Sequence, residues 1–192
     1  MIPSRRIFDE FAGDYDRWFD EHGAVYQAQV SMLRDAVPRT GRGLEVGVGS
    51  GRFAVPLGIC YGVDPSFPLL KIAKDRCIEV TQGEGEHLPY HAGSFDYLLM
   101  MTVICFLENP SEVLHESFRI LMSGGDCILG FIEKDREIAL QYRQENVKGW
   151  FLRFARFLTV DEVTRLLNEA GFSEVLVIRR TRGFCVMKGR KQ

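Results

Sequence analysis

The stretch from 44 to 53, LEVGVGSGRF, constrains the fold of this chain more than any other. Glycines stand at the alternate positions 47, 49 and 51, directly after a short apolar run. A strand that ends in such glycines and leads into a helix lets bare backbone approach a ligand, because a Cβ atom there would collide with it. The pattern therefore predicts a ligand site at a strand-to-helix turn, with a geometry that suits nucleotides.

Two residues around the glycines narrow the class of nucleotide. The dinucleotide motif G-x-G-x-x-G would need its third glycine at position 52, where this chain has Arg52. Glu45, two residues before the first glycine, would repel a pyrophosphate but attract a cationic ligand that carries an ammonium group. The stretch therefore favours S-adenosylmethionine over NAD.

Further motifs follow this turn along the chain. They are YGVDPS at 61–66, QGEGEHLP at 82–89, GSFD at 93–96, RIL at 119–121 with GG at 124–125, and EAGF at 169–172. Together with the E-x-G-x-G-x-G pattern at 45–51, they resemble the motifs of class I S-adenosylmethionine-dependent methyltransferases, in particular the small UbiE-like branch. The resemblance covers most of residues 10–178 and bears on fold and cofactor, and almost not at all on substrate.

Apolar strand-like runs alternate with amphipathic helical stretches, which indicates a parallel sheet with right-handed crossovers. Strands are expected at 43–47, 61–63, 78–82, 95–101, 127–132, 175–178 and 184–187, and helices at about 51–58, 69–76, 110–122 and 160–170. The resemblance implies an α/β Rossmann-like three-layer sandwich with a mostly parallel seven-stranded sheet whose last strand is antiparallel. The ligand would then lie at the carboxyl ends of strands one, two and four.

Two helix ends carry recognisable signals. Gly124-Gly125 is expected to cap the helix 110–122, because a left-handed residue just after a helix favours glycine. Thr159 is followed three residues later by Glu162, which predicts a capping box at the start of the helix 160–170.

We expect one methyltransferase domain over residues 1–192, with two additions to the sheet. Residues 1–40 are predicted to form an N-terminal helical lid of two or three short helices, interrupted at Gly13 and Gly23. Residues 133–158 are predicted to form an insertion near the substrate side. Both segments are placed to cover the ligand edge of the sheet.

Composition excludes several other classes. Hydrophobic residues make up 46% of the chain and the formal charge is −2, so nucleic acid is not expected as the main partner. Five scattered cysteines without a C-x-x-C pair support neither a disulfide framework nor a zinc site, and no metal is expected. No run approaches the ~18 apolar residues of a membrane span. We therefore expect a soluble, cytoplasmic protein, of undetermined oligomeric state.

The resemblance assigns cofactor contacts to two segments. Asp64, followed by Pro65, falls where the family binds the ribose hydroxyls; the alternative is a cap for the next helix. Glu84-Gly85-Glu86 corresponds to a stretch, usually Asp-Ala-Glu, that contacts the adenine amino group. Glu86 has the alternative of a solvated or helix-capping acid.

Two further pairs complete the candidate cofactor site. Met101 and Thr102 follow strand four, where the family contacts the cofactor largely through its backbone. Tyr15 and Trp18 belong to a Y-x-x-W-F pattern that is frequent in small methyltransferases, and aromatic faces attract a sulfonium by cation–π interaction. For these two aromatic residues, packing on the sheet is an equal alternative.

Methyl transfer asks little of side chains beyond alignment and water exclusion. None of the four histidines has a recognisable catalytic partner in the sequence, so no catalytic base is assigned. We expect an S-adenosylmethionine-dependent methyltransferase that acts on a small-molecule acceptor by in-line displacement. The alternatives are an RNA or protein methyltransferase, suggested by the basic residues near the C-terminus, and a non-catalytic module that binds adenosylmethionine or adenosylhomocysteine.

Overall fold

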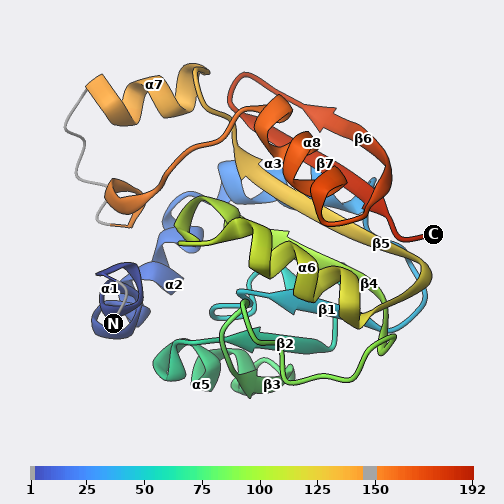
Figure 1. The fold of residues 1–192 in the computed structure, drawn as a ribbon. Coiled ribbons are helices and arrows are strands. Elements are labelled where there is room, and N and C mark those ends of the chain that lie inside the picture. Colours follow the sequence, from blue (N-terminus) through green and yellow to red (C-terminus); the bar gives the residue numbers. More distant parts are fainter. Residues whose placement is uncertain (1–2, 145–150) are drawn as a thin grey trace.

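The computed structural model describes residues 3–144 and 151–192 and shows a seven-stranded sheet flanked by helices (Figure 1). The strands run in the order β3-β2-β1-β4-β5-β7-β6. Their bounds are β1 Gly43–Val46, β2 Tyr61–Asp64, β3 Glu79–Gln82, β4 Phe95–Met101, β5 Leu121–Ile132, β6 Ser173–Arg180 and β7 Phe184–Arg190. Neighbouring strands pair in parallel except at β7, which is antiparallel to both β5 and β6. The expected sheet with its final antiparallel strand is confirmed.

The central strand β4 is apolar along most of its length. Tyr97, Leu99 and Met101 join the core on one face of the sheet, whereas Leu98 and Met100 join the core on the other. A parallel strand between two layers of helices buries both of its faces, so its sequence shows no polar alternation. The sheet is therefore the middle layer of a three-layer sandwich.

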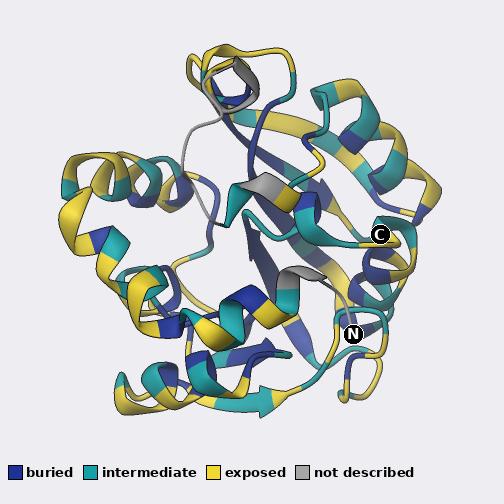
Figure 2. Cartoon of the chain, turned by 90° about the vertical axis from the view of Figure 1, so that its left-hand side faces the viewer, coloured by how far each residue is buried: buried dark blue, intermediate teal, exposed yellow. Residues whose placement is uncertain are grey.

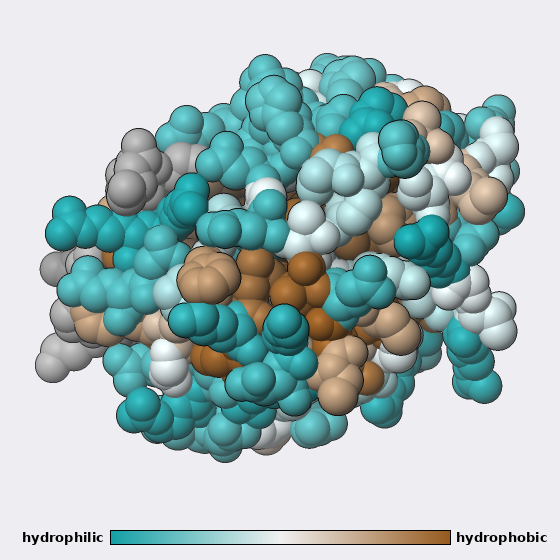
Figure 3. Space-filling model, turned by 90° about the horizontal axis from the view of Figure 1, so that it is seen from below, coloured by the Kyte–Doolittle hydropathy of each residue, from teal (hydrophilic) through white to brown (hydrophobic). Residues whose placement is uncertain are grey.

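Helices cover both faces of this sheet. α3 (Gly23–Arg34), α4 (Ala54–Leu57) and α5 (Phe67–Asp75) pack on one face, and α6 (Pro110–Ile120) and α8 (Val160–Glu169) pack on the other. Buried residues accordingly gather in the central strands and on the inward sides of the helices (Figure 2). The face seen from below is mostly hydrophilic, with apolar side chains gathered in a recess near its middle (Figure 3).

The N-terminal segment forms α1 (Pro3–Glu10), α2 (Ala12–Glu21) and α3 before β1 begins. The helices are separated at Phe11 and His22, whose backbone angles are not helical. The sequence placed the interruptions at Gly13 and Gly23, but Gly13 lies inside α2 and Gly23 begins α3. A glycine costs a helix interior only about 1 kcal/mol relative to alanine, which is too little to end a helix that gains packing elsewhere.

The end of α6 also differs from the prediction. The helix ends at Ile120, and Leu121 already has an extended backbone and pairs with Phe95 of β4. Gly124 and Gly125 therefore lie within β5 and do not cap the helix. Gly124 has a φ of +79° at the point where the register between β4 and β5 shifts. Gly124 is left-handed, as expected, but it allows the register shift in β5 and does not end the helix.

The segment 133–158 leaves β5 and returns to α8. Its described residues include α7 (Glu137–Gln144) and the short 3-10 helix η2 (Leu152–Phe154), and the part from 145 to 150 lies outside the described residues. An isolated bridge between Glu133 and Leu158 joins its two ends. The insertion is therefore anchored where it leaves and rejoins the main fold.

The capping box at the start of α8 is confirmed. The Thr159 hydroxyl accepts the Glu162 N–H at 3.1 Å, and the Glu162 carboxylate accepts the Thr159 N–H at 2.7 Å. Two of the N–H groups that a helix start leaves without partners are thus satisfied by neighbouring side chains.

Candidate cofactor and acceptor site

A cavity of about 620 Å³ opens at the carboxyl ends of β1, β2 and β4. Its walls come from the N-terminal helices, the glycine loop, residues 83–86, the 3-10 helix η1 (Ile104–Phe106) and the insertion. The candidate residues that line it are Tyr15, Trp18, Gly47, Gly49, Asp64, Pro65, Glu84, Gly85, Glu86, Met101 and Thr102. Glu45 and Gly51 do not line it. The topology therefore brings most of the sequence candidates together at one edge of the sheet.

The three glycines of the loop after β1 all have positive φ, between +52° and +80°, but they serve different purposes. A Cβ on Gly47 would lie 2.3 Å from Val103 Cγ2, so this glycine permits close packing by the chain after β4. Gly49 borders the cavity. Gly51 faces α5 and the turn after it, where a Cβ would lie 3.5 Å from Ala73 Cβ and 3.4 Å from Ile78 Cγ1. Gly47 and Gly49 line the cavity and can therefore contact a ligand there, whereas Gly51 does not line it.

Asp64, the last residue of β2, is 8% exposed and lines the cavity. Its Oδ2 accepts the Gly49 N–H at 2.9 Å and its Oδ1 accepts the Ser66 N–H at 2.8 Å. Burial raises the pKa of this carboxyl to about 6, although both N–H groups favour its charged form. A carboxylate accepts about four hydrogen bonds, so two acceptor positions remain. Ser66 is the N-cap residue of α5, so Asp64 supports the helix start and still offers acceptors to a ligand.

Glu45 lies in β1, between β2 and β4, with its side chain almost wholly buried. Burial raises the pKa of its carboxyl well above the ordinary value, and a hydrogen bond from the Ala54 N–H opposes this shift. Its ionised form is therefore disfavoured in the ligand-free chain. Because the side chain is buried behind the loop and does not line the cavity, the geometry differs from the direct charge attraction expected from the sequence.

The segment after β3 supplies Glu84, Gly85 and Glu86 to the cavity wall. The Glu84 carboxylate pairs with the Arg5 guanidinium of α1 at 3.4 Å, so α1 and this loop meet at the cavity. A Cβ on Gly85 would lie 3.0 Å from Val113 Cγ1 of α6. The glycine at this position, where the family usually has alanine, therefore has a packing reason.

Thr102 follows Met101 at the end of β4, and both residues line the cavity. Thr102 has a φ of +57°, and its N–H donates to the Gly130 carbonyl at 2.7 Å. A left-handed conformation costs a residue with a side chain roughly 1–2 kcal/mol. Such strain persists where the surroundings fix the backbone, and it clusters at ligand sites. The end of β4 is thus a fixed backbone edge of the cavity.

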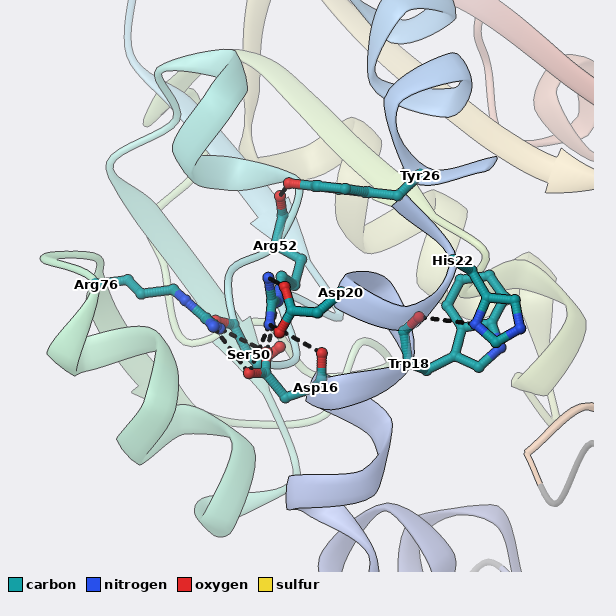
Figure 4. A network of polar contacts seen from close by, with 8 residues as sticks. All are labelled: Asp16, Trp18, Asp20, His22, Tyr26, Ser50, Arg52 and Arg76. Atoms are coloured by element: carbon teal, nitrogen blue, oxygen red, sulfur yellow. Dashed lines mark hydrogen bonds and ion pairs between the residues drawn. The ribbon is translucent and has the colours of Figure 1, made fainter. Parts of the chain in front are cut away.

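Tyr15 and Trp18 project from α2 into the cavity wall. The Tyr15 ring lies against the glycine loop, since a Cβ on Gly49 would be 3.4 Å from its Cε1. Burial, followed by the negative charge of Asp64, raises the pKa of the Tyr15 hydroxyl far above its ordinary value. Trp18 stacks on His22 with ring centroids 4.5 Å apart (Figure 4). Both residues also pack against the hydrophobic core, so the two alternatives of the sequence analysis are compatible.

Several lining residues were not assigned to the site from the sequence. They are Phe8, His22, Val25, Val103, Phe106, Ile138, Phe151 and Leu152. Phe8 stacks on Phe151 with ring centroids 5.2 Å apart, which joins α1 to the insertion. The four-residue spacing of Trp18 and His22 is a signal that indicates a shared face at the end of α2, whereas Val25 belongs to the next helix, α3. Phe151 has no local signal, because its place depends on how the insertion folds back.

Within residues 3–144 and 151–192, no three His, Cys, Asp or Glu side chains are grouped so that they could hold a metal ion. In the same ranges, no helix has both the length and the apolar character needed to cross a bilayer. The cysteines are free thiols. Burial raises the pKa of Cys105, beside the cavity wall, to about 12, so this thiol stays protonated at neutral pH.

Comparison with known proteins shows the family of this chain. A family model described as a methyltransferase domain matches residues 44–129. An uncharacterized protein of Methanocaldococcus jannaschii is 41% identical over 88% of this chain and 82% of its own length. An uncharacterized protein of Mycobacterium bovis is 34% identical over 89% of this chain, which spans 61% of that relative.

A similar solved structure is described by its enzyme class. The crystal structure of a methyltransferase from Thermotoga maritima, described as S-adenosylmethionine-dependent and as a possible histamine N-methyltransferase, matches with a TM-score of 0.90 and 36% identity. The match covers 97% of this chain and 99% of that one. The chain belongs to the S-adenosylmethionine-dependent methyltransferases.

The cofactor of this family is S-adenosylmethionine, and the cavity fits it in three respects. Asp64 keeps two acceptor positions for hydroxyl groups. Gly49 borders the cavity without a side chain of its own. The Ser66 hydroxyl is buried at the cavity without a partner among the described residues. When bound, the cofactor supplies the activated methyl group, and the residues of the chain bind it, orient it and exclude water.

Proposed function

We propose that this methyltransferase transfers the methyl group to a small-molecule acceptor by in-line displacement. The observation that carries the proposal is that, besides the residues assigned to the cofactor, the cavity has a group of apolar and aromatic lining residues that are free to contact an acceptor. These residues are Val25, Phe106, Ile138, Phe151 and Leu152. The volume of the whole cavity, about 620 Å³, lies in the range of roughly 300–1,000 Å³ that is usual for small-ligand sites.

The cofactor contacts that we propose follow the positions of the lining residues. The Asp64 carboxylate accepts the ribose hydroxyls, and Pro65 borders the same part of the cavity. Glu84, Gly85 and Glu86 form the wall beside the adenine ring. Charge-assisted hydrogen bonds of this kind contribute about 1.5–3 kcal/mol each, so Asp64 is expected to give the largest single contribution.

The remaining contacts surround the reacting end of the cofactor. The aromatic faces of Tyr15 and Trp18 lie toward the sulfonium, and the backbone at Met101 and Thr102 forms the opposite edge. Gly51 acts indirectly, because its left-handed backbone, with a φ of +80°, shapes the loop beside α5. Glu45 likewise acts from behind the loop, where its carboxyl accepts the Ala54 N–H at the start of α4.

No general base is assigned in this proposal. Alignment of acceptor and methyl group in a closed site can supply up to ~7–11 kcal/mol of the barrier. Of the four histidines, all within the described ranges, His22 lines the cavity and the other three do not. His115 bonds through Nδ1 to the Ser111 carbonyl at 2.8 Å, within its own helix. A base is therefore needed only for an acceptor that must lose a proton early.

The basic residues near the C-terminus favour this proposal over an RNA methyltransferase. Arg179 pairs with Asp35 at 2.6 Å, and Lys188 pairs with Asp126 at 3.2 Å. Lys191 donates to two main-chain carbonyls at 2.7 Å each. Cations that already have partners within the fold have less to gain from phosphates, because the existing pairs must first be broken.

The test is methyl transfer from labelled S-adenosylmethionine to a panel of amines, thiols, phenols and carboxylic acids, with adenosylhomocysteine release as an independent readout. Amines stand first because the Thermotoga relative is described as a possible histamine N-methyltransferase. Turnover of at least one small acceptor by the wild-type chain supports the proposal. Label transferred only to added RNA or protein would contradict it, and cofactor binding without any transfer would favour the non-catalytic alternative.

A further inference from the structure

A network of charged side chains joins α2 to the glycine loop and to α5 (Figure 4). The Asp16 carboxylate of α2 stands between two guanidinium groups. Arg52 donates to it from Nε at 2.8 Å and from Nη2 at 2.9 Å. Arg76, at the end of α5, donates from Nη1 at 2.7 Å and from Nη2 at 2.8 Å. Both arginines therefore hold the same carboxylate in a bidentate geometry, which fixes its orientation as well as its position.

Further bonds tie this carboxylate to the main chain of the loop. Arg76 also donates to the Ser50 carbonyl at 2.6 Å, and Arg52 also donates to the Asp16 carbonyl at 2.9 Å. Asp20, one turn later in α2, takes two more bonds from Arg52 at 2.7 Å each. The network thus connects backbone of the loop with backbone of α2 through side chains.

The centre of the network is shielded from water. The Asp16 side chain is 17% exposed and that of Arg52 is 15% exposed. Burial alone would raise the pKa of Asp16, but the hydrogen bonds from Arg76 and Arg52 outweigh it and hold the pKa well below the ordinary value. Asp16 is therefore charged at neutral pH, and removal of one partner would leave a shielded charge without its counterpart.

The residue next to Asp16 faces the cavity. Tyr15 lies against Gly49, whose own N–H is bonded to Asp64. Successive side chains of a helix point in directions about 100° apart, so Asp16 can join the charged network while Tyr15, the residue before it, lines the cavity. The ion pairs of Asp16 and the ring of Tyr15 thus belong to adjacent residues of α2.

We propose that Asp16, with Arg52 and Arg76, is a positioning centre that holds α2 against the glycine loop and thereby places Tyr15 beside the bound cofactor. Arg52 stands where a dinucleotide motif would have its third glycine, so this chain uses that position for fixing α2. The proposal rests on the family's cofactor and is independent of the acceptor. If no acceptor is methylated, the proposed function fails but this positioning role can still be tested by cofactor binding.

The test compares binding of adenosylhomocysteine, measured by calorimetry, with thermal stability in the same variants. Asp16→Asn keeps the shape of the side chain and removes its charge. We expect a loss of affinity of about tenfold, a coupling within the range found for residues that act through a neighbour. Arg179→Gln is the matched control, because it breaks an exposed ion pair with Asp35 between two residues that do not line the cavity, and it should leave affinity unchanged.

A double-mutant cycle separates positioning from general stability. If Asp16 acts through Tyr15, then Asp16→Asn should cost little further affinity in a Tyr15→Ala background, because the positioned ring is already absent. Equal losses in both backgrounds would overturn the proposal, as would a lower melting temperature with unchanged affinity. Should Asp16→Asn fail to fold, Arg76→Gln replaces it in the same cycle, with the same expected and contradicting results.

Discussion

The backbone N–H of Gly49 donates to Oδ2 of Asp64 at 2.9 Å, so the glycine loop and the end of β2 share one carboxylate. The loop is tied to the same strand by a second contact, since the Gly47 N–H donates to the Val63 carbonyl at 2.8 Å. Two sequence motifs that lie fifteen residues apart therefore form one unit. A change at Asp64 should consequently alter the loop as well as any direct contact with the cofactor.

Replacement of Asp64 should affect affinity and stability together. We expect Asp64→Ala to weaken binding of adenosylhomocysteine by about 2–4 kcal/mol, because acceptors for the ribose hydroxyls are lost. The Ser66 N–H at the start of α5 also loses its partner, which should lower the free energy of unfolding by about 1 kcal/mol. Calorimetry and denaturant unfolding on the same variant measure both. A stability loss with wild-type affinity would mean that Asp64 serves only the loop and helix.

Cofactor affinity should rise with pH as Asp64 ionises. Its pKa is raised by burial from 3.8 to about 6, and a ribose hydroxyl donates more strongly to the ionised carboxylate. The dissociation constant of adenosylhomocysteine should therefore fall about tenfold between pH 5 and pH 7. Glu45, Asp9 and Arg5 also act on this site, so Asp64→Asn is the control that identifies the titrating group. Persistence of the whole pH effect in Asp64→Asn would assign it to another residue.

Whereas cofactor affinity should rise with pH, the contribution of Asp64 to the stability of the ligand-free protein should fall as pH rises, and over a lower pH range. The unfolded chain releases the Asp64 proton near pH 3.8, whereas the folded chain holds it up to about pH 6. Between these values the folded state binds more protons, so the contribution of Asp64 to the free energy of unfolding falls as pH rises. Denaturant unfolding of wild type and Asp64→Asn at pH 4, 5 and 6 would measure the difference. A difference that grows with pH in favour of wild type would contradict the raised pKa.

Two glycines of the loop offer a matched pair of substitutions. Both have positive φ, so Gly49→Ala and Gly51→Ala should each introduce backbone strain of roughly 1–2 kcal/mol. The new methyl group at 49 lies at the cavity beside Tyr15, whereas the one at 51 lies against Ile78. Gly49→Ala should therefore lose cofactor affinity beyond its effect on stability, and Gly49→Val should abolish binding without unfolding the chain. Equal affinity of the two alanine variants would show that the ligand does not pass Gly49.

The sequence predicted the layers of the fold because these depend on local patterns. The alternating glycines at 47–51, the apolar run of β4 and the Thr159–Glu162 capping box each carry their structural reason within a few residues. The structure departs from the prediction where distant contacts decide. Gly124 serves the pairing of β5 with β4, and the burial of Glu45 between β2 and β4 cannot be read from β1 alone.

The charged network around Asp16 is the clearest case of a feature that depends on contacts between residues far apart in the sequence. Asp16, Arg52 and Arg76 are separated by up to 60 residues in sequence, and each has an ordinary interpretation as a surface charge. Only the packing of α2 against α5 and the loop brings them together. From the sequence, Arg52 only marks the absence of a third glycine. Its contact with Asp16 depends on how α2 packs against the loop.

The N-terminal segment should be protected by ligand, but unevenly. We predict that residues 8–22 act as a lid over the methyl group, because Phe8, Tyr15 and Trp18 line the cavity. Hydrogen exchange in this segment should slow when adenosylhomocysteine is added, while β4, buried already, should barely change. Because the Asp16 network fixes α2, the larger change is expected at residues 8–11, beside the break at Phe11.

Turnover of a Trp18 variant completes this test. Trp18→Ala should lower turnover, measured as adenosylhomocysteine release, with little change in the melting temperature. The reason is that the indole lines the cavity and stacks on the exposed imidazole of His22. Arg179→Gln is again the control, at a residue that does not line the cavity. If exchange in residues 8–22 is as slow without ligand as with it, the segment is a fixed wall. Trp18→Ala would then lower stability and turnover in parallel, as expected for a residue of the core.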